Sequence, residues 1–239
     1  MTLAILQARM SSTRLPGKVL ADVAGAPMIL RQIERLRRAE RLSRLIVATS
    51  TRPDDDPLAE VLAQAGVQVV RGDLDDVLSR FIVALDAAGD QDAAVRLTAD
   101  CPLVDPAVVD ATIDLFTRSG ADYASNTGDQ RTFPKGLDIE VFRTDVLRLA
   151  HAETRDPYDR EHVTPFIYRR PERFKLVTLT QDRREGEVRW TVDRPDDLAF
   201  VRAVYEALYP ARPDFDSEDI RTLVRGRPDL ANLGGDPRA

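Results

Sequence analysis

The sequence predicts an α/β fold with three layers, α/β/α, around a mixed and mainly parallel central sheet. Short apolar runs lie at residues 3–6, 45–49, 67–70 and 93–97, and segments with helical apolar spacing separate them. This alternation is typical of βαβ units with right-handed crossovers. A chain of 239 residues can bury one substantial core. We therefore expect a single domain over 1–225 and a flexible C-terminal tail over 226–239, where Gly, Pro, Asp and Arg are frequent.

The first half of the chain follows this pattern closely. After the first strand, a helix over residues 27–39 places Ile29, Ile33 and Leu36 on one face. The strand at 45–49 precedes a polar loop, 54–56, which should supply the N-cap of a helix over 58–65. Helices from about residue 75 and over 106–119 follow the third and fourth strands. We expect the arginines on the other face of the first helix to be solvated: Arg31, Arg35, Arg37 and Arg38.

Beyond residue 120 the alternation changes. Residues 121–125 and 137–142 resemble strands around a polar loop, and a helix over 163–168 is headed by Arg160, Glu161 and His162. Two further strands are expected at 174–180 and 188–192, before a helix over 196–209. We therefore expect an antiparallel or mixed part of the sheet, with an irregular segment over 126–175.

Composition narrows the class of protein. Acidic residues outnumber basic ones by 40 to 34, a net charge of -6, which argues against a general nucleic-acid binder. Cys101 is the only cysteine, so no intrachain disulfide can form and a reducing compartment fits. No stretch has the pattern of a secretory leader or the length of a membrane span. We expect a cytoplasmic protein with no membrane partner.

The loop after the first strand carries the strongest chemical signal. It places Arg9, Arg14 and Lys18 among small residues, at the edge where open parallel sheets bind ligands. Three fixed cations with freed backbone amides suit a polyanion such as a triphosphate. The loop is not a Walker A motif, because the leading Gly is missing and Val19 occupies the Ser/Thr position. From residue types alone, solvated cations around a Pro-Gly turn are an equally good interpretation.

Acidic residues supply the second signal. Asp100 directly follows the fourth strand, where one carboxylate can hold Mg2+ against substrate phosphates, or can simply cap a turn. Asp138 and Glu140 alternate with apolar residues, so both side chains face one side of a strand. They either bind sugar hydroxyls or form the ordinary polar face of a half-exposed strand. Cys101 lacks a base to activate it and is expected to be a small, partly buried thiol.

The chain resembles the cytidylyltransferases that activate acidic sugars as CMP derivatives. This family includes the CMP-Kdo and CMP-sialate synthetases, and the SpsF-like branch is the most similar. The resemblance extends to about residue 205 and implies a Rossmann-like nucleotidyltransferase fold, similar to that of GT-A glycosyltransferases. It is carried by residues 7–20 (QARMSSTRLPGKVL), 96–106 (RLTADCPLVDP), 136–140 (GLDIE), 160–165 (REHVTP) and 192–198 (VDRPDDL).

The resemblance assigns roles in a transfer of CMP from CTP to an acidic acceptor, with release of pyrophosphate. Arg14, Lys18 and Asp100 would be catalytic, and Asp100 and Asp193 would hold Mg2+. Acceptor contacts would come from Asp138, Glu140, Arg160 and His162, and residues 126–175 would contribute to a homodimer. Nucleotide contacts would come from Ala8, Arg9, Ser11, Ser12, Arg14, Lys18, Arg71, Asp76, Arg80 and Thr98.

Two other classes of protein stay open at this point. A GT-A-type glycosyltransferase would need an Asp-x-Asp motif after a strand, and residues 54–56 and 73–75 match only its letters. A non-catalytic nucleotide-binding protein would have no reason to retain Arg14, Lys18, Asp100 and Asp193 together. The segment 99–102 reads Ala-Asp-Cys-Pro, whereas the CMP-Kdo enzymes have Gly-Asp-Glu-Pro, so the acceptor need not be Kdo.

Overall fold

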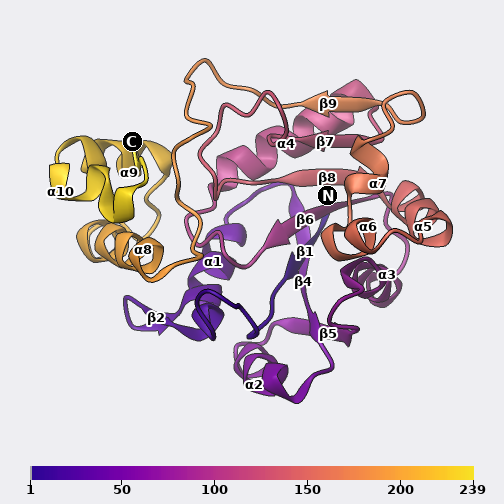
Figure 1. Ribbon diagram of the computed structural model, residues 1–239, viewed down its shortest axis with the longest axis horizontal. Helices are drawn as coiled ribbons and strands as arrows, with labels where there is room; N and C mark the ends of the chain where they lie inside the picture. Colours follow the sequence, from indigo (N-terminus) through magenta and orange to yellow (C-terminus); the bar gives the residue numbers. More distant parts are fainter. Residues whose placement is uncertain (1) are drawn as a thin grey trace.

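The computed structural model describes residues 2–239, and its centre is a seven-stranded sheet (Figure 1). The strands lie in the order β5-β4-β1-β6-β8-β7-β9. A separate two-stranded hairpin consists of β2 Asp22–Val23 and β3 Ala26–Pro27. The bounds of the main strands are β1 Thr2–Gln7, β4 Leu42–Ser50, β5 Gln68–Gly72, β6 Ala93–Thr98, β7 Tyr123–Ser125, β8 Glu140–Arg143 and β9 Leu176–Thr178.

Parallel pairing dominates the sheet, as the sequence predicted. β1 pairs in parallel with β4 and β6, and β4 pairs in parallel with β5. β8 is antiparallel to both β6 and β7, so the expected mixed part of the sheet is confirmed. The carboxyl ends of β1, β4, β5 and β6 therefore meet at one edge, and the loops that follow them lie together there.

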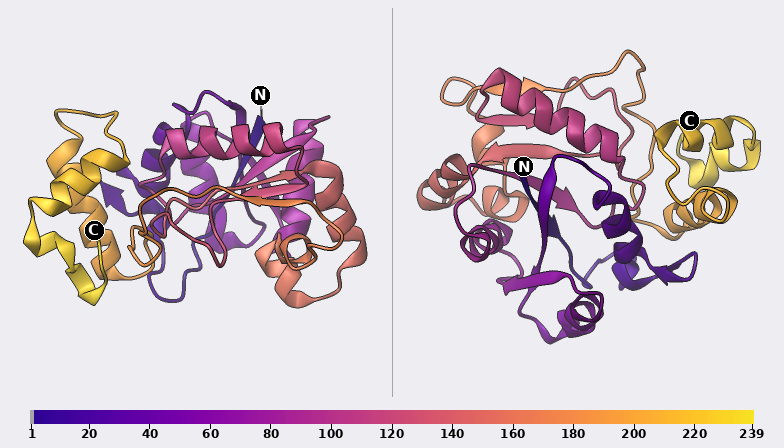
Figure 2. Two further views of the ribbon diagram at one scale, coloured as in Figure 1. Left: turned by 90° about the horizontal axis from the view of Figure 1, so that it is seen from above. Right: turned by 180° about the vertical axis from the view of Figure 1, so that it is seen from behind.

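Helices cover both faces of the sheet and complete the three layers (Figure 2). The faces separate along β1, where Ala4 and Leu6 join one core and Leu3 and Ile5 join the other. The first core includes α1 Met28–Leu36, α2 Asp56–Gln64 and α4 Pro106–Ser119. The second includes α3 Val77–Ala88, α5 Thr144–Glu153 and α7 Pro165–Tyr168. The predicted fold class is therefore confirmed.

A third hydrophobic cluster lies beside the sheet, at the yellow end of the chain in Figure 2. It is built on α8 Pro195–Leu208 and α9 Ser217–Arg225, with Trp190 fully buried at its centre. The residues after 225 pack against it through α10 Pro228–Ala231 and the 3-10 turn Leu233–Gly235. Leu230 is buried, and the indole of Trp190 donates to the carbonyl of Arg238 at 2.8 Å. A flexible tail makes no such contacts, so this expectation is corrected.

The terminal segment is held by a fully buried ion pair. Arg238 Nη2 and Asp197 Oδ1 are 2.8 Å apart, and neither side chain is exposed. We expect Arg238→Met to lower the free energy of unfolding by about 3–5 kcal/mol, because it removes one partner of a buried charge pair. Urea denaturation followed by Trp190 fluorescence measures this change. The matched control is Arg227→Met at the exposed pair with Asp229, which should leave the midpoint unchanged, and equal effects would contradict the prediction.

The arginine face of α1 is not uniformly solvated, which corrects a sequence expectation. Arg35 is only 2% exposed; its Nε donates to the carbonyl of Val104 at 2.7 Å, and its guanidinium lies 4.3 Å from the Phe215 ring centre. Burial lowers the pKa of Arg35. The reason is tertiary, because the third cluster covers this side of α1. Periodicity within the helix carries no information about that neighbour.

Two expected elements differ locally. A helix α6 Pro157–His162 precedes α7, so residues 160–162 end one helix instead of heading the next. The break falls at Val163, whose φ is +73°. Residues 188–192, expected as a strand, form only one bridge, between Arg189 and Lys135. Their alternating burial is real, and Gly136, at φ +112°, lets the two chains approach closely beside that bridge, since a Cβ there would lie 2.6 Å from the amide nitrogen of Thr191.

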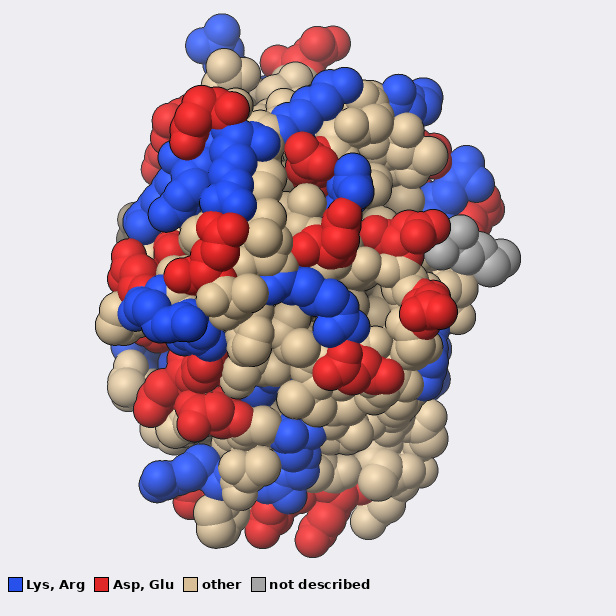
Figure 3. Space-filling model, turned by 90° about the vertical axis from the view of Figure 1, so that its right-hand side faces the viewer, with Lys and Arg blue, Asp and Glu red and all other residues tan. Residues whose placement is uncertain are grey.

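Charges of both signs are interspersed on the surface over α3, α5 and α6, with no large area of one sign (Figure 3). Between residues 2 and 239, no helix has the length and apolar character needed to cross a membrane.

Candidate functional site

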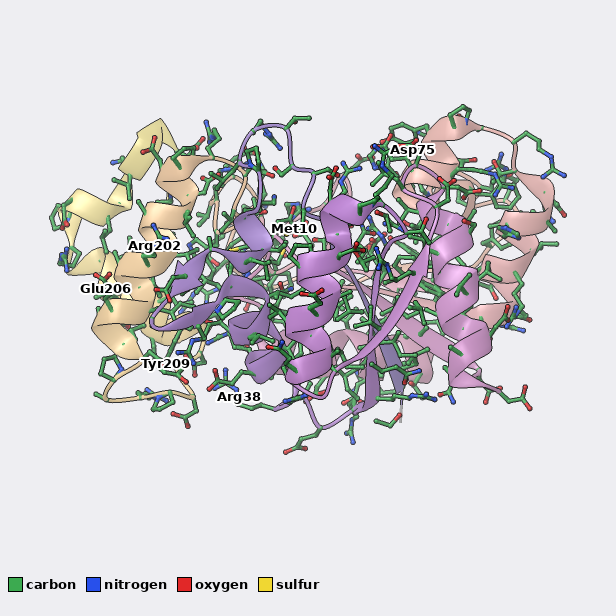
Figure 4. All side chains as sticks on the ribbon, turned by 90° about the horizontal axis from the view of Figure 1, so that it is seen from below. Met10, Arg38, Asp75, Arg202, Glu206 and Tyr209 are labelled. Carbon is green, nitrogen blue, oxygen red and sulfur yellow. The ribbon has the colours of Figure 1, made fainter. Side chains whose placement is uncertain are left out.

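The loop between β1 and the 3-10 turn η1 Lys18–Leu20 lies across the carboxyl edge of the sheet. In Figure 4, Met10 and Asp75, which follow β1 and β5, lie at this edge, whereas Arg38 lies at the opposite one. Gly17 adopts a φ of +71° and donates its amide to the carbonyl of Met10 at 3.0 Å. This left-handed turn, which glycine adopts without strain, directs Lys18 back toward the sheet.

Asp55 anchors the loop instead of capping a helix. Its carboxylate is 1% exposed and accepts the amide of Met10 at 2.6 Å and that of Ser50 at 3.1 Å. It therefore ties the loop after β1 to the end of β4. The side chain makes no cap bond to α2, so the expectation of a polar capping loop at 54–56 is wrong for this residue.

Lys18 is the most constrained cation of the site. Its side chain is only 10% exposed, and its Nζ donates to the carbonyl of Val192 at 2.6 Å. The same ammonium lies 3.2 Å from Asp193 Oδ1 and 3.7 Å from Asp100 Oδ2. The two aspartates come from loops almost a hundred residues apart in the chain. The fold thus gathers both around one ammonium.

Asp193 is surrounded by positive charge. In addition to Lys18, its carboxylate lies 2.9 Å from Arg14 Nη2 and 2.6 Å from Arg189 Nη2. Burial alone would raise the pKa of Asp193, but the hydrogen bond from Arg189 and the charges of Lys18 and Arg14 lower it. Arg14 is 61% exposed and can reorient toward a ligand, while Lys18 and Arg189 are fixed.

Asp100 is oriented by its own turn. The hydroxyl of Thr98, at the end of β6, donates to Asp100 Oδ1 at 2.6 Å, which leaves Oδ2 facing Lys18.

The neighbouring thiol of Cys101 is buried, and burial together with the charge of Asp100 raises the pKa of this thiol well above the usual range. A thiol held in the neutral form is a poor nucleophile, as the sequence predicted.

A cleft of about 330 Å³ opens above these residues. It is lined by Gln7, Thr13, Val19, Val77, Ala99 and Glu161, which sequence reasoning did not select as site residues. It also brings together ten of the residues that the sequence predicted for the site: Ala8, Arg9, Ser12, Arg14, Lys18, Arg80, Thr98, Asp100, His162 and Asp193.

Arg80 is a buried cation at the wall of this cleft. It is 2% exposed, and among the described residues its Nε and Nη1 have no hydrogen-bond partner. Burial and the nearby charge of Arg9 lower its pKa. Gly72 leaves room for it, since a Cβ there would lie 2.7 Å from Arg80 Cγ. Unpartnered buried donors at a cleft wall are suited to an oxygen-rich ligand.

A second cleft of about 790 Å³ adjoins the first. Glu140 lies in its wall and accepts hydrogen bonds from the hydroxyls of Tyr123 at 2.6 Å and Thr164 at 2.5 Å, besides its ion pair with Arg96. Burial alone would raise the pKa of Glu140, but Arg96 and the two hydroxyls hold it below its usual range. The carboxylate therefore stays ionised, and its lone pairs are occupied.

Glu140 should make stability depend on pH. A carboxylate with a lowered pKa stabilises the fold above its unfolded value, about pH 4.5, and that stabilisation is lost as the pH falls further. As the pH is lowered below 4.5, we expect the urea midpoint of the native protein to fall more steeply than that of the Glu140→Gln protein. The control, Glu187→Gln, removes a carboxylate whose side chain is 90% exposed and should retain the native slope. Identical slopes for all three proteins would contradict this.

Asp138 also lines the second cleft, although it precedes β8 and is not within it. Its two oxygens lie 2.5 and 3.0 Å from the guanidinium nitrogens of Arg131. Sequence reasoning missed Arg131, Tyr158, Tyr168 and Arg169 in this wall, because they come from an irregular loop and from helix ends, where no periodicity marks them.

Four predicted residues lie outside the walls of both clefts: Ser11, Arg71, Asp76 and Arg160. Arg71 instead donates to the carbonyls of Ser50 and Arg52. Asp76 accepts the amide of Ser79 at the start of α3 and pairs with Arg160 at 2.7 Å. The contacts of Arg71 tie β5 to the end of β4, and the pair of Asp76 with Arg160 links the start of α3 to α6.

The residues present fit a divalent cation held jointly with a substrate. Asp100 and Asp193 offer two carboxylates within 3.7 Å of the Lys18 ammonium, and one or two carboxylates are the usual protein share of an Mg2+ site whose remaining ligands are water and phosphate. Over residues 2–239, no group of three or more acidic, His or Cys side chains forms an all-protein cage. The donor set therefore suits Mg2+ delivered with phosphates.

Comparisons with known proteins agree with this geometry. The family model described as cytidylyltransferase matches residues 3–211. The spore coat polysaccharide biosynthesis protein SpsF of Bacillus subtilis is 31% identical, over 95% of this chain and 95% of its own length. The 3-deoxy-manno-octulosonate cytidylyltransferase of Mesorhizobium japonicum is 36% identical, over 94% of this chain and 93% of its own.

A solved structure has the same fold over almost the whole chain. The structure of a cytidylyltransferase from Leptospira borgpetersenii is 31% identical, with a TM-score of 0.89, and the match covers 96% of each chain.

Proposed function

Because this chain belongs to the cytidylyltransferase family and is a CTP-dependent nucleotidyltransferase, we propose that it transfers CMP from CTP to an acidic sugar. The observation that carries the proposal is the grouping of Arg14, Lys18, Asp100 and Asp193 in a cleft that adjoins a second, larger one. The first cleft takes the nucleotide and the second takes the acceptor. The transfer would serve the biosynthesis of a surface polysaccharide or glycoconjugate.

The reaction is a displacement at the α-phosphorus by an acceptor oxygen, with pyrophosphate as the leaving group. Such a reaction needs fixed positive charge where negative charge develops. The ammonium of Lys18, which donates to the carbonyl of Val192, is preorganised for this task. The exposed side chain of Arg14 can leave its ion pair with Asp193 and bind the β- and γ-phosphates instead. Arg9 supports the triphosphate from the end of β1, and Arg80 offers its unpartnered donors from the wall.

Asp100 and Asp193 would hold Mg2+ against the phosphates of CTP. When bound, the ion would supply Lewis-acid stabilisation of phosphate charge and a template for the substrate. Thr98 keeps Asp100 in the orientation this requires, by donating to its other oxygen.

The acidic character of the acceptor is supported by the relatives and by Arg169. The name of one relative, the cytidylyltransferase of Mesorhizobium japonicum, refers to the acidic sugar 3-deoxy-manno-octulosonate. In the second cleft, Arg96 is paired with Glu140 and Arg131 with Asp138. Arg169, in contrast, is about half exposed, and the nearest carboxylate, that of Asp159, lies 3.7 Å away, which is a loose pair. Arg169 can therefore turn toward an acceptor carboxylate.

The homodimer expected over residues 126–175 stays a prediction. Tyr158 and Tyr168 lie in this segment and are two of the three large apolar side chains that are exposed in the described part of the chain. Light scattering should give twice the mass of the chain. A single-chain mass at every concentration tested would contradict the dimer.

The glycosyltransferase alternative finds less support in the site. Neither Asp-x-Asp segment lines either cleft: Asp56 pairs with Arg71 at 2.6 Å, and Asp73 accepts the amides of Asp75 and Asp76.

A thermal shift panel tests the proposal. CTP, UTP, ATP and GTP are each added with and without Mg2+, and UDP- and GDP-sugars form a second panel. A ligand that binds only the folded state raises the midpoint by mass action. We expect a rise with CTP that depends on Mg2+ and exceeds that of the other nucleotides. A rise with the UDP- or GDP-sugars alone would favour the glycosyltransferase, and no rise with any compound would contradict both.

A further inference from the structure

We infer that His162 is the general base that takes the proton from the acceptor hydroxyl. This inference rests on the proposed function, and it goes beyond a contact with the acceptor. Only Thr98 and His162, among the described residues, line both clefts, so these two side chains lie where the nucleotide and the acceptor meet.

Thr98 does not suit the role. Its hydroxyl proton is donated to Asp100 at 2.6 Å, and a threonine hydroxyl is not a base near neutral pH. Histidine is the side chain whose unperturbed titration lies between pH 5 and 8, and the neutral imidazole accepts a proton readily. Of the two residues at the junction, His162 is therefore the one with suitable chemistry.

Two of the three carboxylates that line the second cleft, those of Glu140 and Asp138, are already engaged, and the third, that of Asp129, is exposed and does not line the first cleft. Glu140 accepts from Tyr123 and Thr164 and pairs with Arg96, while both oxygens of Asp138 face Arg131. A base must have a free lone pair within reach of the reacting hydroxyl. The charged and titratable groups that share the clefts with His162 are Arg9, Arg14, Lys18, Arg80, Arg96, Asp100, Tyr123, Asp129, Arg131, Asp138, Glu140, Tyr158, Glu161, Tyr168, Arg169 and Asp193.

The backbone next to His162 is strained in a way that holds the imidazole at this junction. Val163 is a fully buried, β-branched residue with a φ of +73°, a conformation that such residues rarely adopt. The turn lets His162 end α6 and Thr164 precede α7, so that Thr164 reaches Glu140. The ring of Tyr158 packs 4.2 Å from the imidazole and limits its rotation.

The acceptor oxygen forms a bond to the α-phosphorus while its proton passes to a neutral nitrogen of His162. The bond from the α-phosphorus to the bridging oxygen of the β-phosphate breaks, and its electron pair leaves with pyrophosphate. The imidazolium then returns its proton to water.

NMR of the imidazole groups tests the position of His162 without any acceptor. The chain has only two histidines, His151 and His162, and His151→Gln assigns their signals. We expect Mg2+ and CTP to shift the His162 signals and to leave those of His151 in place, because His151 lies outside both clefts. If thermal shift shows that CTP binds but the His162 signals do not move, the inference is wrong. If CTP does not bind, the proposed function fails and this inference fails with it.

Activity then tests the chemistry, with 3-deoxy-manno-octulosonate and sialate as the acceptors. We expect His162→Gln to lower kcat by 10²- to 10⁴-fold, to leave the CTP-induced thermal shift unchanged, and to remove the acidic limb of the kcat–pH profile. If neither sugar is turned over by the native protein, the inference is overturned for acidic acceptors even where CTP binds. A His162→Gln protein that retains native kcat or the native acidic limb would also overturn it.

Discussion

Lys18→Met should lower kcat/KM for cytidylyl transfer by roughly 10²- to 10³-fold, the loss commonly seen when one preorganised electrostatic contact is removed. Lys18 is nearly buried, its Nζ donates to Val192, and it neutralises Asp100 and Asp193. Methionine has a similar length and no charge. It therefore preserves packing while it removes the fixed cation from the leaving group. Steady-state release of pyrophosphate from CTP measures the effect.

The matched control for this prediction is Lys135→Met. Lys135 pairs with the exposed side chain of Glu187 and lines neither cleft, so its removal should leave kcat/KM at the native value. Thermal denaturation of both variants separates misfolding from loss of chemistry. A folded Lys18→Met protein whose kcat/KM equals that of Lys135→Met would contradict the role of Lys18.

Asp100→Asn should reduce turnover by at least roughly 10²- to 10³-fold while the fold stays intact. The asparagine oxygen can still accept from Thr98, so the turn retains its main hydrogen bond. What is lost is the negative charge beside Lys18 that would hold Mg2+ with Asp193. The expected signature is a much higher Mg2+ requirement together with lower kcat, measured by Mg2+ titration at saturating CTP.

Asp114→Asn is the comparison variant for Asp100→Asn. Asp114 pairs with Arg41 on the surface and lies outside both clefts. The turnover of the Asp114→Asn protein should therefore depend on Mg2+ as that of the native protein does. Near-normal turnover of Asp100→Asn at saturating Mg2+ would remove Asp100 from the proposed metal site.

The part of the fold that obeys local rules could be predicted from the sequence. The parallel strands β1, β4, β5 and β6 and helix α4 are short apolar runs and one amphipathic segment, and they lie where their patterns indicated. The grouping of Lys18, Asp100 and Asp193 was also expected, because family motifs marked all three. Motif and periodicity agreed in these places.

What escaped prediction depends on contacts between distant segments. The sequence pattern around Arg35 is that of a solvated residue, but the third cluster covers its side chain. The pattern around Arg238 is typical of a loose tail, but its guanidinium pairs with Asp197. Asp55 looked like a capping residue, yet its carboxylate binds the loop after β1. Residues that line the second cleft, such as Arg131 and Arg169, come from irregular segments and have no local signal.

Cytidylyl transfer to an acidic sugar is tested most directly by the release of pyrophosphate from the native protein, measured for CTP, UTP, ATP and GTP against acidic and neutral sugars. We expect release with CTP and an acidic sugar, dependence on Mg2+, and little release when the nucleotide is changed or the acceptor carboxylate is absent. Equal release with neutral sugars, or none with any acidic sugar although CTP binds, would contradict it.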